Sequence, residues 1–115
     1  MTTLYGIPNC DTVKKARAWL TSQGKAHVFH DFKKQGVPSD QLTLWVQEVG
    51  WEALLNRKGT TWRKLAADEQ AATGTSAGAQ ALMQAQPSVI KRPVVDWGVG
   101  VITVGFNAVD WQRRL

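Results

Sequence analysis

The chain has 115 residues, 43% of them hydrophobic and 20% charged, which suits one globular domain. A single cysteine excludes an internal disulfide, and therefore a secreted module held together by disulfides. No basic segment precedes a long apolar run, and no apolar stretch approaches the roughly 20 residues that cross a bilayer, so we expect no signal peptide, no membrane partner and a cytoplasmic location. The net charge of +5 favours anionic partners. Its basic residues are scattered rather than gathered in one run, which disfavours a nucleic-acid-binding arm.

The first third of the chain predicts a β-α-β unit. Residues 4–7 form a short apolar strand that ends at Pro8. Val13, Ala16 and Leu20 then recur at helical spacing, and Gly24 ends the helix. Residues 26–32 alternate as a second strand, and it is expected to run parallel to the first because a helix connects them.

The middle of the chain is predicted to be helical. Ser39 is expected to cap a helix whose apolar face carries Leu42, Trp45, Val46 and Val49, with Gly50 at its end. A short segment over 51–55 and a polar stretch follow. Further helices are expected with Thr61 and Ser76 as caps, the first containing Trp62, Leu65 and Ala66, the second ending before Pro87.

The end of the chain predicts an antiparallel hairpin and a last helix. Val94 and Val95 begin one strand, residues 96–100 supply turn residues, and residues 101–106 form the second strand. Asn107 with Asp110 three residues on resembles a capping box for a helix over 108–114. The predicted order is β-α-β, a helical block, then β-β-α, within a single domain spanning 1–115.

Cys10 lies between a predicted strand and a predicted helix, at or next to the helix start. Free N–H groups and the positive dipole end at that place stabilise an anion, so a thiolate there should have a lowered pKa. Thr12 can donate a hydroxyl hydrogen bond to the sulfur, Asn9 can shape the turn, and Lys14 adds positive charge. The carboxylate of Asp11 either opposes the thiolate or turns away to cap the helix.

Other interpretations of these residues stay open or are disfavoured. Cys10 could be a small buried hydrophobic residue, as free cysteines often are. Val13 stands where a C-x-x-C motif would have its second cysteine, so a redox cycle needs an external thiol. His27 and His30 have no metal-ligand spacing with the cysteine, so we expect no metal site and ordinary strand histidines. Residues 98–100 are interpreted as a turn, not a dinucleotide motif.

The run from Tyr5 to Ala16, with its N-C-D-T-x-K-K-A pattern, resembles the opening of the arsenate-reductase-like family that contains ArsC and Spx, and most closely its YffB branch. Residues 54–63, 87–95 and 104–107 resemble the family in the same order. The likeness covers nearly the whole chain, and it favours a functional Cys10.

The resemblance implies an α/β, thioredoxin-like fold with a mixed four-stranded sheet and a helical insertion at about 39–86. It also implies a cis peptide bond before Pro93, with Arg92 near Cys10. A guanidinium at that place would favour the thiolate and hold an oxyanion or a glutathione carboxylate by a two-pronged contact.

Arg57, Lys58 and Lys91 are further candidates for binding the anionic part of a substrate, with solvated surface charges as the alternative. Arsenate reductases of this fold hold the oxyanion with three arginines. Only Arg92 matches; the second falls at Asn56, beside Arg57, and the third falls near Gly105, where no cation stands. We therefore do not expect efficient arsenate reduction.

The resemblance implies a thiol-dependent reductase that uses the Cys10 thiolate on a small anionic or thiol substrate. No bound cofactor is expected; glutathione or a redoxin would act as the external thiol. The alternative is a non-enzymatic regulator that, like Spx, binds RNA polymerase. The physiological substrate, the electron donor and the oligomeric state stay open.

Overall fold

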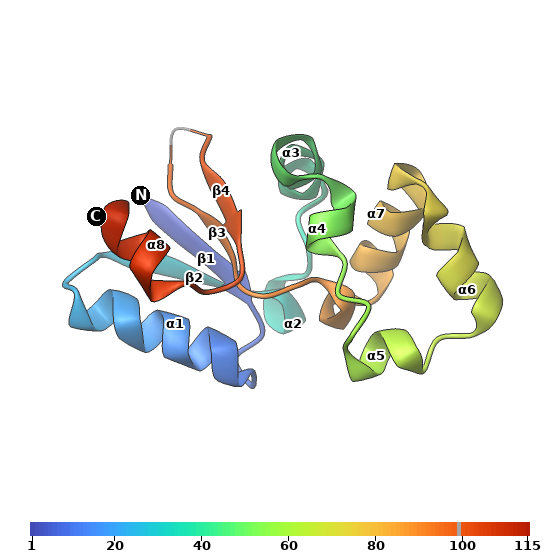
Figure 1. Ribbon diagram of the computed structural model, residues 1–115, viewed down its shortest axis with the longest axis horizontal. Coiled ribbons are helices and arrows are strands. Elements are labelled where there is room, and N and C mark those ends of the chain that lie inside the picture. Colours follow the sequence, from blue (N-terminus) through green and yellow to red (C-terminus); the bar gives the residue numbers. More distant parts are fainter. Residues whose placement is uncertain (99) are drawn as a thin grey trace. The chain divides into compact units, whose positions relative to one another are not determined.

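The computed structural model describes residues 1–98 and 100–115 (Figure 1), so Val99 of the predicted turn lies outside the described residues. These residues form two compact units. The sheet unit comprises Met1–Phe32 and Arg92–Leu115, and the helical unit comprises Lys33–Lys91. The elements in chain order are β1 (Thr2–Gly6), α1 (Asp11–Ser22), β2 (His27–Asp31), α2 (Phe32–Gln35), α3 (Ser39–Val49), α4 (Trp51–Leu54), α5 (Thr60–Arg63), α6 (Ala67–Ala71), η1 (Ala72–Gly74), α7 (Ser76–Ala85), η2 (Pro87–Val89), β3 (Val94–Asp96), β4 (Ile102–Val104) and α8 (Ala108–Arg113).

The sheet has four strands in the order β2-β1-β3-β4. β1 pairs with β2 in parallel, while β3 runs antiparallel to both β1 and β4. The predicted mixed sheet, the parallel first pair and the closing hairpin are therefore confirmed. The last strand is shorter than the predicted 101–106, and it ends before Gly105, whose φ of 85° lies outside the extended region.

One face of the sheet is covered by α1 and α8 (Figure 1). Leu4 of β1 and Val95 of β3 are directly opposite each other, so both side chains point to that face. The buried cluster there consists of Leu4, Val13, Ala16, Leu20, Val95 and Trp111. Trp111 of α8 has the ring centroids of Phe106, Trp97 and Trp19 at 4.7, 5.0 and 5.9 Å, all in edge-to-face geometry. This apolar layer fixes α1, and so the position of its first residue.

The helical unit contains α3 to α7 over the stretch predicted as an insertion. Its fully buried side chains include Leu42, Trp45 and Met83. Leu55 pairs with Ile90 in an isolated antiparallel bridge, which ties the segment after α4 to the end of the unit. That both units form one domain stays a prediction. No helix among the described residues is long and apolar enough to cross a membrane.

Two helices in this unit begin earlier than predicted, the first by one residue and the second by two. Ser39 is the first residue of α3, and the preceding Pro38 is its N-cap. The helix expected after Thr61 begins at Thr60, with Gly59 as N-cap. It also ends at Arg63, so Leu65 and Ala66, which were predicted to belong to this helix, lie in the connection between α5 and α6.

Hydrogen bonds identify the N-cap residues of α7 and α8. Thr75, not Ser76, caps α7, because its hydroxyl oxygen accepts the N–H of Gly78 at 3.1 Å. The predicted cap of α8 is confirmed: the side-chain oxygen of Asn107 accepts the N–H of Asp110 at 3.0 Å.

Candidate active site

Cys10 is the N-cap residue of α1. Its backbone is extended, with φ −135° and ψ 123°, and its carbonyl accepts the N–H of Lys14 at 2.9 Å to close the first helical turn. The predicted place of the cysteine at the helix start is confirmed. Its thiol therefore stands beside the first N–H groups of the helix, which have no partner within the helix.

The pKa of the Cys10 thiol lies below its ordinary value. Partial burial raises the pKa, but three donors outweigh this effect. They are the backbone N–H of Val13, the Arg92 guanidinium, which adds both a hydrogen bond and its charge, and the backbone N–H of Thr12. Thr12 lowers the pKa through its backbone N–H, whereas its hydroxyl was expected to donate the hydrogen bond.

Arg92 lies beside Cys10 and directly precedes Pro93. The bond between Arg92 and Pro93 is cis, as the resemblance implied. Pro93 is buried and leads directly into β3, the neighbour of β1. The expected proximity of the guanidinium and the sulfur is thus confirmed by their hydrogen bond.

Cys10 is not sealed in the interior. It is partly exposed while one side packs against the buried cluster under α1. The neighbouring residues Asn9, Asp11, Thr12 and Lys14 are all exposed. A reagent from solvent can therefore reach the sulfur, and the alternative of a wholly buried cysteine is not supported.

Three further predicted cations belong to the helical unit. Arg57, Lys58 and Lys91 line a depression of about 270 Å³ together with Glu52, Ala53, Leu55 and Asn56. The guanidinium carbon of Arg57 lies 5.7 and 5.9 Å from the ring centroids of Trp51 and Trp62. Their role toward a substrate of Cys10 stays a prediction.

The two histidines lie in β2, as expected. Nδ1 of His27 is 3.0 Å from the carbonyl oxygen of Lys25, and the ring of His30 is 5.0 Å from that of Tyr5. Over residues 1–98 and 100–115, no group of three side chains suited to a metal ion comes together.

Two features of the site were not anticipated. Free N–H groups at the helix start were expected to stabilise the thiolate, but the sequence did not indicate that the N–H of Val13 makes the largest single contribution that lowers its pKa. Trp97 and Phe106 pack against the same buried cluster as Cys10. The available signal was that a large aromatic residue follows each strand of the last hairpin: Trp97 comes directly after β3, and Phe106 comes two residues after the end of β4.

The fold and this site define a thioredoxin-like protein with one thiol at a helix N-terminus. The model of the ArsC family matches residues 5–113, so the chain belongs to the ArsC family. The arginine pattern expected of efficient arsenate reduction is nevertheless incomplete in the sequence, since Asn56 and Gly105 stand where two of the three arginines would be.

Individual relatives agree with this assignment. A solved structure of a YffB protein is 46% identical, covers 100% of this chain and 99% of its own, and superposes with a TM-score of 0.94. An uncharacterised protein of Haemophilus influenzae is 39% identical over 97% of this chain and 96% of its own length. The global transcriptional regulator Spx of Streptococcus agalactiae is 29% identical over 93% of this chain and 77% of its own.

Proposed function

We propose that this protein is a thiol-dependent reductase with Cys10 as its nucleophile and glutathione as the external thiol. The proposal depends above all on one observation, the partly exposed Cys10 sulfur bonded by Arg92 and by the first N–H groups of α1. A thiolate favoured in this way is a nucleophile at neutral pH. Membership of the ArsC family supports the same class of chemistry.

The chemistry proposed is attack by the Cys10 thiolate on an electrophilic sulfur or arsenic centre. For a disulfide substrate, a bond forms between Cys10 and one sulfur while the substrate's S–S bond breaks, and the departing thiolate takes a proton from solvent. A glutathione thiolate then attacks the mixed disulfide. Cys10 leaves as thiolate, and the attacking glutathione keeps the new disulfide bond. Val13 occupies the place of a resolving cysteine, so the second thiol comes from outside.

The anionic part of the substrate is assigned to Arg92. Its guanidinium lies at the sulfur, and a planar cation of this kind binds a carboxylate or oxyanion through two parallel hydrogen bonds. Arg57 and Lys58 are proposed as further anion-binding residues, because the two cations line the same depression of the helical unit.

Oxidised glutathione tests the proposal directly. Mass spectrometry of the protein should show one glutathione added at Cys10, formed quickly near pH 7 and removed by reduced glutathione. Cys10→Ser should form no adduct, and Arg92→Ala should form it more slowly. Arg17→Ala is the matched control, since Arg17 lies over the ring of Phe29 at 4.0 Å. An adduct that forms no faster than on free cysteine would sink the proposal.

A second candidate function is a regulator of the Spx kind, which would act on RNA polymerase. The similarity to Spx over 93% of the chain favours it. The absence of a C-x-x-C pair in the sequence argues against control by an internal disulfide. Binding of purified RNA polymerase, with the same affinity for wild type and Cys10→Ala, would support this alternative over the reductase.

A further inference from the structure

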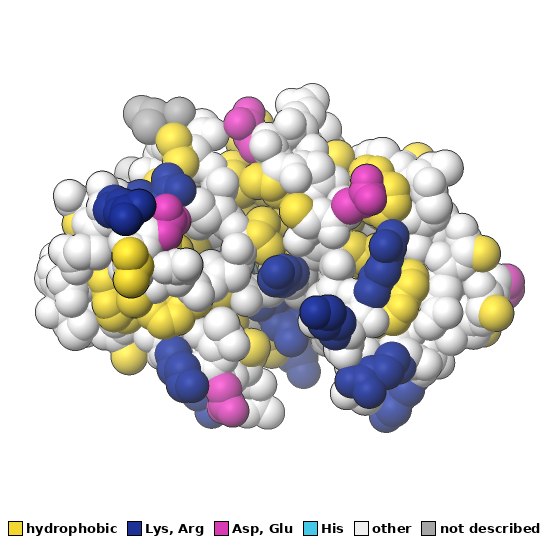
Figure 2. Space-filling view, in the orientation of Figure 1, with side chains coloured by type: hydrophobic (Ala, Val, Ile, Leu, Met, Phe, Trp, Pro, Cys, Tyr) yellow, Lys and Arg dark blue, Asp and Glu magenta, His cyan; other side chains and the backbone are white. Residues whose placement is uncertain are grey.

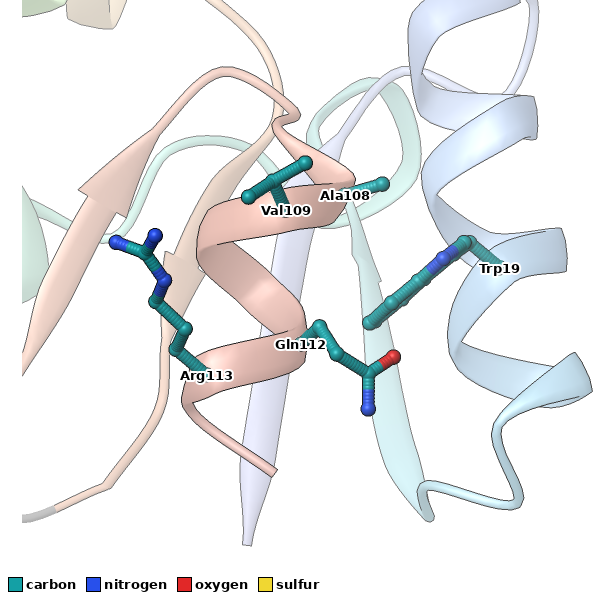
Figure 3. A pocket seen from close by; sticks show the side chains of 5 residues that line it. All are labelled: Trp19, Ala108, Val109, Gln112 and Arg113. Carbon is teal, nitrogen blue, oxygen red and sulfur yellow. The ribbon is translucent and has the colours of Figure 1, made fainter.

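A groove runs between α1 and α8 on the outer side of the sheet unit. Its volume is about 460 Å³, and it is lined by Trp19 of α1 and by Ala108, Val109, Gln112 and Arg113 of α8. Figure 3 shows Trp19 and Gln112 facing each other from the two helices, with Val109 and Arg113 along one side of α8. The groove belongs entirely to the sheet unit.

The lining of the groove is apolar and open to solvent. Val109 is 68% exposed, the highest fraction among large hydrophobic side chains in the described helices and strands. Trp19 is held in place by its edge-to-face contacts with Phe106 and Trp111. A rigid indole wall beside an exposed valine is the kind of surface that accepts an apolar anchor from a partner.

The borders of the groove are positively charged. Lys15 is exposed and lies one helical turn before Trp19, on the same face of α1, while the exposed Arg113 is itself part of the lining. The carboxylate of Asp110 is already paired with Arg114 at 3.0 Å. In Figure 2, yellow side chains show between α8 and α1, with dark-blue side chains on either side of them and magenta side chains next to the dark-blue ones.

We propose that this groove docks an amphipathic helix of another protein, one with apolar residues on the docking face and acidic residues beside them. Apolar anchors at helical spacing would enter the groove beside Trp19 and Val109. The flanking carboxylates would lie near Lys15 and Arg113, where opposite charges favour encounter and the correct register.

Two other occupants fit the observations less well. A second copy of this chain, docked through the same face, would bring two positively charged borders together, which is repulsive. An anionic lipid surface suits the charge, but a membrane binds protruding apolar side chains. Here only Val109 protrudes, while Trp19 is partly buried and forms the wall of the groove, which favours an inserted side chain.

A synthetic helical peptide tests the proposal. The probe has leucines at helical spacing along one face and glutamates elsewhere, and its affinity is measured by fluorescence anisotropy. Its controls are a peptide of the same composition in scrambled order and a version with lysine in place of glutamate. We expect the probe to bind at least about tenfold more tightly than the scrambled peptide. NMR shift changes should fall on α1 and α8.

Three variants of the protein locate the binding. Val109→Asp should lower the affinity for the glutamate peptide at least about tenfold. Arg113→Glu should lower the affinity for the glutamate peptide and raise the affinity for the lysine peptide. Val28→Asp is the matched control, because Val28 is also an exposed valine of the sheet unit but lies in β2. It should leave the affinity unchanged.

Other results would overturn the proposal. They are equal binding of the scrambled peptide, no effect of Val109→Asp, self-association that Val109→Asp abolishes, or binding to anionic vesicles that outcompetes the peptide. The outcome is separate from the proposed reductase function: Cys10→Ser should bind the peptide like wild type, and Val109→Asp should form the glutathione adduct like wild type.

Discussion

The guanidinium of Arg92 donates a hydrogen bond to the sulfur of Cys10, although the two residues come from opposite parts of the sequence. Replacing Arg92 by Ala removes both this bond and the positive charge, so the pKa of the thiol should rise. Alkylation by iodoacetamide near pH 7 should then slow about three- to tenfold, because only the thiolate reacts. The rate measured across pH gives the pKa directly.

Arg92→Lys should fall between wild type and Arg92→Ala, since it keeps the charge without the planar fork. The Arg17→Ala variant should react like wild type. If Arg92→Ala alkylates with the wild-type pH profile, the bond between these two residues does not set the reactivity of Cys10.

Folding stability should depend on pH through the same thiol. A group whose pKa is lower in the folded than in the unfolded protein stabilises the fold above its unfolded pKa, and this stabilisation is lost as pH falls through the folded pKa. The pKa of Cys10 is lowered in the folded protein. In urea unfolding, the stability of wild type relative to Cys10→Ser should therefore increase as the pH rises from about 6 to about 9, toward and past the ordinary pKa of cysteine. A constant difference between the two proteins would contradict this.

Gly78 of α7 has no room for a side chain. A methyl group at this position would lie 1.8 Å from the backbone oxygen of Ala72. Gly78→Ala should therefore lower the free energy of unfolding by about 1–3 kcal/mol, despite the higher helix propensity of alanine. Gly74→Ala is the control, because nothing lies within 4 Å of its added methyl group. Urea denaturation that gives the two variants equal stability would refute the steric argument.

The start of α7 offers a test between two neighbouring hydroxyls. Thr75→Ala removes the acceptor for the Gly78 N–H and should cost about 0.5–2 kcal/mol of stability. Ser76→Ala removes only the acceptor for the side-chain amide of Gln80 and should cost less. Thermal unfolding followed by circular dichroism distinguishes them; a larger loss for Ser76→Ala would reverse the assignment of the cap.

The β-α-β opening and the closing hairpin were predictable because local patterns are strong there. Val13, Ala16 and Leu20 recur at helical spacing and are all fully buried. A single helix that crosses between two neighbouring strands favours a parallel pair, and this is the arrangement of β1 and β2. The same pattern placed Cys10 at the helix start, and this is the main feature of the site.

Local sequence patterns did not predict which of two neighbouring residues caps a helix. They also did not predict contacts between residues that are far apart in the sequence. A serine and a threonine stand side by side at 75 and 76, and only the backbone φ and ψ select Thr75 as the cap. The contact from Arg92 depends on how β3 returns beside β1, which the family resemblance implied but periodicity alone did not. The groove between α1 and α8 likewise arises only when both helices pack on the sheet.

The arrangement of rings around Trp111 has an optical consequence. Its indole is 5.0 Å from that of Trp97 and nearly perpendicular to it, at 83°, while three of the six tryptophans belong to the helical unit. Neighbouring indoles held in a fixed orientation couple their electronic transitions and give a near-ultraviolet circular dichroism band. Trp111→Phe would remove this band, which makes the native pair a spectroscopic reporter of the sheet unit that needs no added dye.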